Sequence, residues 1–489
     1  MDVAQLFHEQ HPDTFLWVPE ANTFFIYDGR RWTVDVDGEL NACLRKMIRD
    51  IEATARIGFE EAEEIAFTAG KDTKESRDKR RNALARLNTA RKFAERGPYR
   101  SIVEFFKELP GVRKSLADFD TLPNVLNVRN GVLSFDEHGV QLYGHERSDY
   151  FSKVVHVDYD ETAECPRWER FLAECFPDDP SMADYLQRLV GYSLLGRNNE
   201  HIVPVLYGPR GRNGKSTFIN ALSHVFAEFT KHPKFSTFTE NTKGDIRVDL
   251  VDLKGARFTF TSEGDAKNKL DASTIKGMSG ADPITARLPY AKEQITFRPV
   301  GLIWVTSNFA PKADGSDDAL FARLKLIEWG QRFVGERADK NLEATLRNEA
   351  RGILRWAVEG AVKYLQNGLG EPEQVQAATE EYKNANDPLY GFLPGVLVID
   401  ELARMAPKAL YDHYTDWCEA EKVPERVRYG RNNLNRVLRD RGVPFANGRN
   451  GKPQPCVRLA NEEERAVHGV DPLPLERRRS PEYASREEF

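Results

Sequence analysis

The residues between 207 and 218 carry the strongest chemical signal in the sequence. The stretch YGPRGRNGKSTF sets three glycines ahead of Lys215 and Ser216. Glycines let backbone N–H groups turn toward a polyphosphate, a lysine reaches the β and γ oxygens, and a serine hydroxyl ligates Mg²⁺. The pattern therefore predicts a site for ATP and Mg²⁺. Its expected nucleotide-binding residues are Gly208, Gly211, Arg212, Asn213, Gly214, Lys215, Ser216 and Thr217.

The flanking residues place this loop between a strand and a helix. The apolar run IVPVLYG at 202–208 is typical of a buried strand, and a helix is expected over about 215–227. A helix that begins at the loop adds partial positive charge where an anion would bind. These neighbours disfavour the alternative, a glycine-rich turn with an incidental lysine. Five residues separate Gly208 from Gly214 where the usual pattern has four, so the role of Gly208 stays open.

Two later strand ends carry the polar side chains that hydrolysis requires. Hydrolysis needs a carboxylate beside the loop to hold Mg²⁺ or to orient the attacking water. Glu263 closes the predicted strand ARFTFTSE, and Asp265 could assist it, although an exposed turn residue is the simpler interpretation of Asp265. Asn308 closes GLIWVTSN, and its amide could polarise the same water or sense the γ-phosphate. The predicted metal ligands are Ser216 and Glu263.

A parallel α/β sheet would bring these residues together. Strand patterns at 202–208, 256–262 and 301–307 alternate with helical patterns, and residues 340–367 are strongly helical. In a fold of this class the carboxyl ends of parallel strands meet at one edge of the sheet. We therefore expect the loop, Glu263 and Asn308 to lie at that edge.

The segments before this core are interpreted as scaffold. Residues 14–40 predict a small antiparallel sheet, and residues 41–108 predict helices interrupted by the polar stretch GKDTKESRDKRR, which we interpret as a solvated loop. Short strands are expected over 122–160 and two helices over 167–196. None of these elements carries an obvious chemical role.

Charge, cysteine content and hydropathy exclude several classes of protein. The 70 Lys and Arg residues against 76 Asp and Glu give a net charge of −6, so binding to nucleic acid would need local basic patches. Five cysteines without C-x-x-C spacing argue against a disulfide framework and a zinc site. The N-terminus lacks a signal-peptide pattern, and no apolar run reaches about 18 residues. We expect a cytoplasmic protein that does not engage a membrane.

Five motifs in fixed order resemble those of superfamily 3 helicases. They are GPRGRNGKST, FTFTSE, IKGMSGADPITARLPYAKEQITFRP, WVTSN and DDALFARLKLIEW. The sequence is most similar to phage and plasmid primase-helicases related to the poxvirus primase-helicase, over roughly residues 120–465. The resemblance implies a hexameric, AAA+-like ATPase that moves along single-stranded DNA in a bacterial host cytoplasm.

The resemblance also implies a role for each motif residue. Lys215 and Ser216 would hold nucleotide and metal, Glu263 would activate water, Asn308 would be the sensor, and Arg323 would be an arginine finger in the neighbouring subunit's site. A helix-surface arginine paired with a nearby aspartate is the alternative for Arg323. The sequence departs from many relatives at the second motif, where Ser262 and not a second acidic residue precedes Glu263, and at the turn SGAD.

Two regions are candidates for contact with DNA. In the resembling helicases a hairpin enters the ring channel, and here it corresponds to PITARLPYAKEQITF. Arg287 and Lys292 could grip phosphates while Tyr290 stacks on a base, although a plain surface hairpin is the alternative. Lys276 could face DNA or a neighbour's nucleotide.

The second candidate region lies near the C-terminus. Residues 404–458 contain twelve basic residues against six acidic ones, within two predicted helices and a hairpin that together suggest a winged helix. A protein-contact role is the alternative for the same fold. The expected DNA-binding residues of this region are Arg431, Arg436, Arg439, Arg449 and Lys452.

The predicted domain order follows from these assignments. It comprises an N-terminal α+β region at 1–118, an accessory region of the resembling family at 119–200, an ATPase core with a helical lid at 201–390, a winged-helix-like domain at 391–465 and a disordered tail at 466–489.

Three functions fit the sequence. The first is a ring-forming DNA helicase, and the second is an ATP-switched replication initiator without processive unwinding. The third is a primase or polymerase, because Asp35 and Asp37 form a D-x-D pair, but the pair sits at a glycine turn and is interpreted as turn chemistry. The expected partners are single-stranded and forked DNA, further copies of this chain in a hexamer, and a separate primase or polymerase.

The water-activating role of Glu263 predicts a specific defect. Glu263→Gln should retain ATP binding but hydrolyse little, because the amide keeps the shape of the side chain and removes the carboxylate that orients water. Nucleotide binding and phosphate release, measured on the same preparation, check this. Persistent hydrolysis would move the assignment to Asp265.

Overall fold

A five-stranded parallel sheet forms the centre of the protein. The computed structural model describes residues 2–68, 73–239, 248–262, 269–280, 282–286, 295–308, 311, 313, 317–387, 389–425, 428–448 and 451–467. Every neighbouring pair in this sheet is parallel, and the spatial order is β13-β7-β12-β9-β8. The strands are β7 (Val203–Tyr207), β8 (Thr230–Lys231), β9 (Phe258–Ser262), β12 (Leu302–Ser307) and β13 (Leu324–Glu328). The predicted α/β class with a parallel sheet is confirmed.

Both faces of the sheet are buried, which explains the continuous apolar residues of β7 and of the first four positions of β12. On β12, Leu302 and Trp304 belong to one hydrophobic cluster, while Ile303 and Val305 belong to another on the opposite face. The first face packs against α6 (Ser181–Leu194), α7 (Lys215–Val225) and α11 (Ala350–Asn367). The second packs against α8 (Ala272–Met278) and α12 (Glu373–Asn386).

Residues 119–200 share the hydrophobic core of the sheet. Their elements are β4 (Val125–Val128), β5 (Gly131–Asp136), β6 (Gly139–Tyr143), α5 (Pro166–Cys175) and α6, as the sequence patterns predict. The Trp168 ring of α5 stacks on Phe218 of α7 at 5.5 Å and meets Trp356 of α11 edge-on at 5.3 Å. Aromatic pairs of this kind add to the stabilisation from burial. The accessory segment and the helix behind the glycine loop therefore pack as one body.

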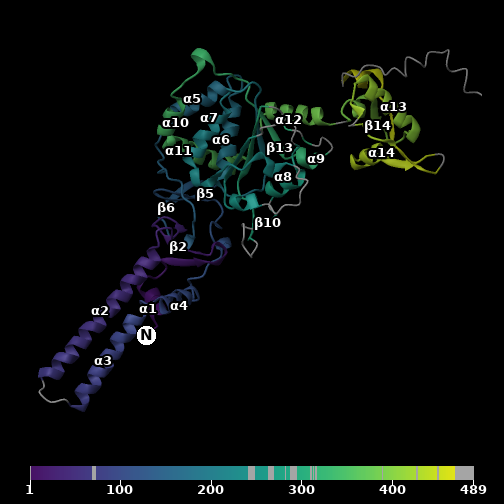
Figure 1. Cartoon of the computed structure of the whole chain (residues 1–489). Coiled ribbons are helices and arrows are strands. Elements are labelled where there is room, and N and C mark those ends of the chain that lie inside the picture. The colour runs from purple at the N-terminus through teal and green to yellow at the C-terminus, as the bar shows by residue number, and fades with distance from the viewer. Residues whose placement is uncertain are drawn as a thin grey trace, which may run out of the picture.

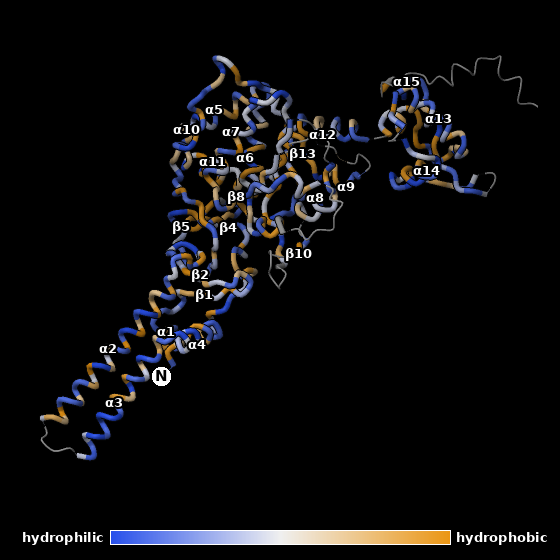
Figure 2. Tube along the Cα trace, viewed as in Figure 1, coloured by the Kyte–Doolittle hydropathy of each residue, from blue (hydrophilic) through white to orange (hydrophobic). Residues whose placement is uncertain are grey.

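The N-terminal region combines a small sheet with a long helical hairpin that projects from the rest of the protein (Figure 1). The antiparallel sheet predicted within 14–40 is present, and it packs against α1 and α4. The outer half of the hairpin is mostly hydrophilic (Figure 2). The elements are α1 (Val3–Gln10), β1 (Phe15–Val18), β2 (Thr23–Tyr27), β3 (Trp32–Val34), α2 (Glu39–Thr68), α3 (Lys74–Lys92) and α4 (Arg96–Lys107).

One expectation about this hairpin was wrong. We interpreted the polar stretch at 70–81 as a loop, but α3 already begins at Lys74. Thr73 caps the helix by accepting a hydrogen bond from the Ser76 N–H, and Lys79 pairs with Glu75 one turn earlier. Local capping and i,i+4 charge pairs thus support a helix in a segment that lacks apolar residues.

Asp35 of the D-x-D pair has a turn role, as expected. The Asp35 carboxylate accepts hydrogen bonds from the backbone N–H groups of Glu39 at 2.7 Å and Leu40 at 3.1 Å, at the start of α2. Such a carboxylate satisfies helix N–H groups that have no partner within the helix. Within the part of the chain that the structure describes, no group of three His, Cys, Asp or Glu side chains could hold a metal ion.

The C-terminal unit has its own core, which includes Phe392, Tyr414 and Trp417. An ion pair at 2.8 Å between Arg441 and Asp387 fixes it to the end of α12. Its elements are β14 (Leu397–Ile399), α13 (Pro407–Ala420), α14 (Arg431–Asp440), β15 (Phe445–Asn447), β16 (Pro453–Pro455), β17 (Val457–Leu459) and α15 (Glu462–Val467). Both predicted helices and the predicted hairpin are present, and β14 adds a second pairing with β17.

The remaining elements surround the sheet. They are β10 (Ile284–Ala286), β11 (Ile295–Phe297), α9 (Asp318–Phe321) and α10 (Leu342–Asn348). Among the described helices, none is both long enough and apolar enough to cross a membrane.

A buried arginine ties the accessory segment to the sheet. Arg257 precedes β9, is 5% exposed, and donates to the carbonyl oxygens of Leu194 at the end of α6 and Val125 of β4. Burial lowers the pKa of its guanidinium to about 10. Gly196 lies so close to this guanidinium that a side chain there would collide with it. The contact therefore fixes three segments that are distant in sequence.

Arg257→Met should destabilise the core, because two buried carbonyl groups lose their donor. We expect a loss of roughly 3 kcal/mol of unfolding free energy. Urea unfolding followed by tryptophan fluorescence measures it, since Trp168, Trp304 and Trp356 all lie in this core. Arg56→Met is the matched control, because Arg56 makes only an exposed pair with Glu52 on α2. Equal urea midpoints for the two variants would contradict the role of Arg257.

Candidate active site

The strand register brings the predicted residues to one edge of the sheet. Ser307 of β12 lies opposite Tyr207 of β7, and Thr306 lies opposite Ser262 of β9. The Gly208 N–H donates to the Ser307 carbonyl at 3.2 Å, so the two strand ends are joined directly. Gly208 and Asn308 therefore lie side by side at the carboxyl edge. Glu263, the residue after Ser262, lies outside the described residues, and so does Asp265.

The glycine loop, residues 208–214, has an unusual backbone. Arg210, Gly211, Arg212 and Gly214 all have positive φ, between 54° and 93°. In turn conformations of this kind, successive backbone N–H groups can converge on one concave side, which is a common way to bind an anion. The sequence pattern of small residues predicts such a loop, but it does not predict that two arginines adopt left-handed backbone.

Gly208 is required by crowding. A side chain at this position would meet the Lys215 Nζ at 2.9 Å and the Trp329 carbonyl oxygen at 2.7 Å. The Gly208 carbonyl also accepts a hydrogen bond from Lys215 Nζ at 3.0 Å. The extra residue in the loop thus leaves Gly208 in contact with the lysine.

Lys215 joins the loop to the second strand end. Its Nζ donates to the Asn213 side-chain oxygen at 3.0 Å and to the Asn308 side-chain oxygen at 3.3 Å, in addition to Gly208. The residue is 6% exposed, and burial lowers the pKa of its ammonium to about 8. Neutral oxygens hold this cation in place but do not compensate its charge. The site is therefore suited to an anionic ligand.

Two further features fit a phosphate group. Gly214 is the N-cap of the 11-residue helix α7, so the free N–H groups of the first turn of α7 face the loop. Ser216 is exposed in this first turn. Asn213 is 4% exposed, and its side-chain Nδ2 has no hydrogen-bond partner among the described residues. A buried donor of this kind is costly unless an acceptor is supplied. An incoming phosphate oxygen would be such an acceptor.

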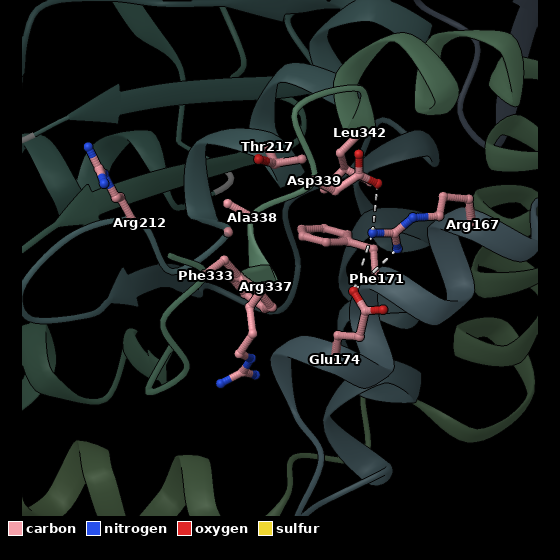
Figure 3. A pocket seen from close by; sticks show the side chains of 11 residues that line it. Arg167, Phe171, Glu174, Arg212, Thr217, Phe333, Arg337, Ala338, Asp339 and Leu342 are labelled. Carbon is pink, nitrogen blue, oxygen red and sulfur yellow. Dashed lines mark hydrogen bonds and ion pairs between the residues drawn. The ribbon is translucent and has the colours of Figure 1, made fainter. Parts of the chain in front are cut away.

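The residues after β13 support the loop from outside. The Trp329 N–H donates to the Tyr207 carbonyl at 2.6 Å, and the Phe333 N–H donates to the Arg212 carbonyl at 2.9 Å. A cavity opens here, beside Gly214 (Figure 3). It is lined by Arg167, Phe171, Glu174, Arg212, Gly214, Thr217, Phe333, Arg337, Ala338, Asp339 and Leu342.

Most residues of this cavity are not predicted from the sequence. We interpreted the helices of 167–196 as scaffold, but α5 supplies Arg167, Phe171 and Glu174 to its wall. The segment after β13 supplies the opposite wall. No motif marks these residues, because they reach the loop only through tertiary packing. The resemblance over roughly residues 120–465 is the one signal that spans them.

Arg323 lies at the other edge of the sheet. It directly precedes β13, and its carbonyl accepts a hydrogen bond from the N–H of Val203, the first residue of β7. Five strand residues separate this level from Gly208, which corresponds to roughly 17 Å. The Arg323 side chain therefore does not reach the glycine loop of its own chain.

The structure disfavours the surface-pair interpretation of Arg323. Asp317 pairs with Lys276 at 2.7 Å, and Asp318 pairs with Lys383 at 2.9 Å. The Arg323 guanidinium donates to the Ala319 carbonyl at 2.7 Å, while its Nε is buried and has no partner among the described residues. The two aspartates are thus engaged elsewhere and brace the segment that carries Arg323.

The predicted DNA-contact residues are placed only in part. β10 and β11 pair as the antiparallel stems of the expected hairpin, but Arg287, Tyr290 and Lys292 lie outside the described residues. The ammonium of Lys276 is engaged by Asp317, so that contact would have to open before Lys276 could bind another anion.

In the C-terminal unit, the three predicted arginines of α14 are exposed. The Arg439 guanidinium lies over the Phe445 ring of the hairpin at 4.3 Å. Lys452 is also exposed on this hairpin, whereas Arg449 lies outside the described residues. The buried residues of α14 are Leu434, Val437 and Leu438, so its cationic side chains point away from the core.

The fold and the site define an α/β protein whose candidate site lies at the carboxyl edge of a parallel sheet. A family model described as "D5 N terminal like" matches residues 4–177, and one described as "Family of unknown function (DUF5906)" matches residues 206–323. These two matches and the viral relatives described below support the similarity to primase-helicases that the motifs indicate.

The curated relatives are viral proteins. One from Acanthamoeba polyphaga mimivirus, named as a helicase, is 27% identical over 286 residues, which cover 54% of this chain and 29% of the relative. One from African swine fever virus, named as a primase, is 22% identical over 304 residues, covering 58% and 31%. One from Sputnik virophage, named as a helicase, is 26% identical over 177 residues, covering 32% and 22%. Each match spans less than a third of the relative.

A solved structure of the C-terminal region of NrS-1 also matches. It covers 94% of this chain and 99% of its own chain, with a TM-score of 0.45 and 11% identity.

The environment of Lys215 predicts its titration. The ammonium should titrate near pH 8, and Asn308→Asp should raise that pKa, because a carboxylate beside the ammonium favours the charged form. NMR of ¹³C-labelled lysine measures both values. Asn220→Asp, at an exposed position on α7, is the matched control and should leave the pKa of Lys215 unchanged. An unaltered pKa in Asn308→Asp would contradict the contact.

The lowered pKa of Lys215 determines how its contribution to the free energy of unfolding changes with pH. An unfolded lysine has a pKa of about 10.4, so the folded state binds fewer protons than the unfolded state between pH 8 and that value. The contribution of Lys215 to the free energy of unfolding is thus unfavourable at pH 7 and is relieved as the pH rises through this window.

Proposed function

We propose that this protein is an ATP-dependent, ring-forming DNA helicase of superfamily 3. It would translocate on single-stranded DNA and unwind duplex during replication of a phage, plasmid or other mobile element. The observation that carries the proposal is the opposite placement of two cationic residues. Lys215 is buried in a loop built for an anion at the carboxyl edge of the sheet, and Arg323 has an unpartnered, buried Nε at the amino edge.

Nucleotide binding would use the glycine loop as a P-loop in an AAA+-like core. Lys215 would leave its neutral oxygen acceptors to meet the β and γ oxygens, and the Asn213 amide would gain an acceptor. Ser216 would ligate Mg²⁺ together with waters and Glu263, and the metal would neutralise charge that develops on the phosphates. Asn308, already in contact with Lys215, would sense the γ-phosphate.

Hydrolysis would require two subunits. Arg323 does not reach its own loop, whereas a neighbour docked head to tail would present Arg323 to the nucleotide. A planar, permanently charged group can neutralise the transition state of phosphoryl transfer. Repeated head-to-tail contacts close into a ring when the rotation permits, and we propose a hexamer.

DNA binding would draw on the hairpin between β10 and β11 and on the C-terminal unit. In that unit α13, α14 and the β15–β16 hairpin follow one another as in a winged helix, and the α14 arginines lie on its exposed surface. The local positive charge suits a phosphate backbone in a chain whose net charge is −6. Forked DNA and a separate primase or polymerase are the partners that this function implies.

A replication initiator without processive unwinding is the second candidate. The same nucleotide site and basic unit would serve an ATP-switched protein that binds an origin. Unwinding of a forked substrate distinguishes the two, because both hydrolyse ATP.

A subunit-mixing experiment tests the ring. Lys215→Ala subunits lack the nucleotide contact but keep Arg323, and Arg323→Ala subunits have the opposite defect. Each preparation alone should hydrolyse ATP poorly. A mixture should recover activity, because a subunit with Lys215 intact can then lie next to a subunit with Arg323 intact. Single-stranded DNA should be present, and phosphate release is the measurement.

Two control experiments test whether recovery depends on Lys215 and Arg323 in different subunits. Mixing either variant with inactive copies that carry both substitutions should restore nothing. Arg56→Ala, which removes an exposed arginine of α2 far from the site, should hydrolyse ATP on its own like the wild-type protein. No recovery in rings that demonstrably contain both single variants would assign Arg323 to local structure and remove the argument for an intersubunit site.

A further inference from the structure

The cavity beside the glycine loop has no role in the mechanism described so far. It measures about 190 Å³ and adjoins Gly214 and Thr217 (Figure 3). Its walls come from two segments far apart in the sequence, α5 on one side and residues 333–342 on the other. The side-chain contacts of Lys215 described above are with Gly208, Asn213 and Asn308, and none of these residues belongs to either segment.

The position of the cavity relative to α7 is informative. A triphosphate that reaches Lys215 and Asn308 with its γ end would place its remaining phosphates along the loop toward the first turn of α7. Gly214 and Thr217 form that turn, and they are also the residues at which the cavity begins. Whatever is attached to the α-phosphate would leave the loop at this opening.

The walls of the cavity suit an aromatic ring. Phe171 is 1% exposed and packs against Gly214, so it forms a fixed apolar floor. Phe333 is only half-buried, and its backbone N–H is bonded to the Arg212 carbonyl, which holds its ring beside the loop. Leu342 adds further apolar surface. Partly exposed aromatic side chains of this kind stack on nucleic-acid bases.

The polar groups at the cavity suit a sugar and its phosphate. Arg167 is held by Glu174 at 3.3 Å and by Asp339 at 3.4 Å, which gives a fixed set of donors and acceptors. The Arg337 guanidinium lies 5.4 Å from the centre of the Phe333 ring, and Arg212 is exposed on the loop itself. Cations at the rim would attract a polyanion, while the ion-paired group could hydrogen-bond to hydroxyls or to a base edge.

We propose that this cavity binds the nucleoside half of the triphosphate, with the base stacked on Phe333 and the floor formed by Phe171. The inference rests on the proposed nucleotide site and extends it. Because α5 lies within residues 4–177, the N-terminal family region contributes directly to nucleotide binding. Nucleotide occupancy is thereby linked to the accessory segment and not to the sheet alone.

Two probes separate the nucleoside from the phosphates. Mg²⁺-ATP occupies both the loop and the cavity, whereas inorganic tripolyphosphate with Mg²⁺ occupies only the loop. Wild-type protein should bind ATP more tightly than tripolyphosphate. Phe333→Ala should weaken ATP binding by about tenfold, the loss expected for one base stacked on an aromatic ring, and should leave tripolyphosphate binding within about twofold. Calorimetry on the full chain measures each affinity.

Two further variants distinguish the loss of base stacking from distortion of the glycine loop. Phe333→Trp retains a flat ring and should restore ATP affinity toward the wild-type value. Phe105→Ala removes an aromatic side chain that is 68% exposed on α4, and it should change neither affinity. Phe333→Ala that weakens both probes equally would show loop distortion and overturn the proposal.

Other results of the binding measurements would contradict either the cavity proposal or the proposed function. Unchanged ATP affinity in Phe333→Ala, or equal affinities of wild-type protein for ATP and tripolyphosphate, would show that the base lies elsewhere. Failure of wild-type protein to bind either probe would overturn the proposed function itself. Failure of the cavity is thus distinguishable from failure of the nucleotide site.

Discussion

The parallel register of four strands is the constraint on which the rest of this structure depends. β13, β7, β12 and β9 all run in one direction, so every strand end of one polarity meets at the same edge. Parallel strands need long crossover connections, and those connections carry the helices that bury both faces. Residues separated by about a hundred positions, such as Lys215 and Asn308, thereby come within 3.3 Å. The same register places Arg323 at the far edge.

Two buried cations differ in the groups that hold them. Arg257 and Lys215 are both nearly inaccessible, and burial lowers the pKa of each. Arg257 bonds to carbonyl groups of α6 and β4, and a guanidinium with a pKa of about 10 stays charged at neutral pH. Lys215, with a pKa of about 8, bonds to groups that a phosphate could replace. A buried charge is costly without an anion, so the cost at Lys215 favours an anionic ligand.

The accessory segment belongs to the active-site architecture and not to a detached module. Trp168 stacks on Phe218 behind the glycine loop, and Phe171 of the same helix lies against Gly214. Helix α5 thus touches both the back of α7 and the wall of the cavity. If the loop binds nucleotide as proposed, this helix would respond to nucleotide occupancy through direct packing, because close-packed interiors transmit small displacements. The projecting α2–α3 hairpin lies beyond this segment (Figure 1).

The sequence alone determined the class of fold, the glycine loop, the strands that end at Ser262 and Ser307, and the C-terminal pair of helices with its hairpin. Those features depend on local periodicity, turn residues and a motif of contiguous residues, which need no partner elsewhere in the chain. Only the tertiary structure decided that Gly208 keeps its contact with Lys215 despite the longer loop. It alone placed Arg323 out of reach of its own loop and set Phe171 and Phe333 around one cavity. The first outcome depends on the backbone path of the loop. The other two depend on strand register and on packing between segments more than 40 residues apart, for which a single sequence carries no local signal.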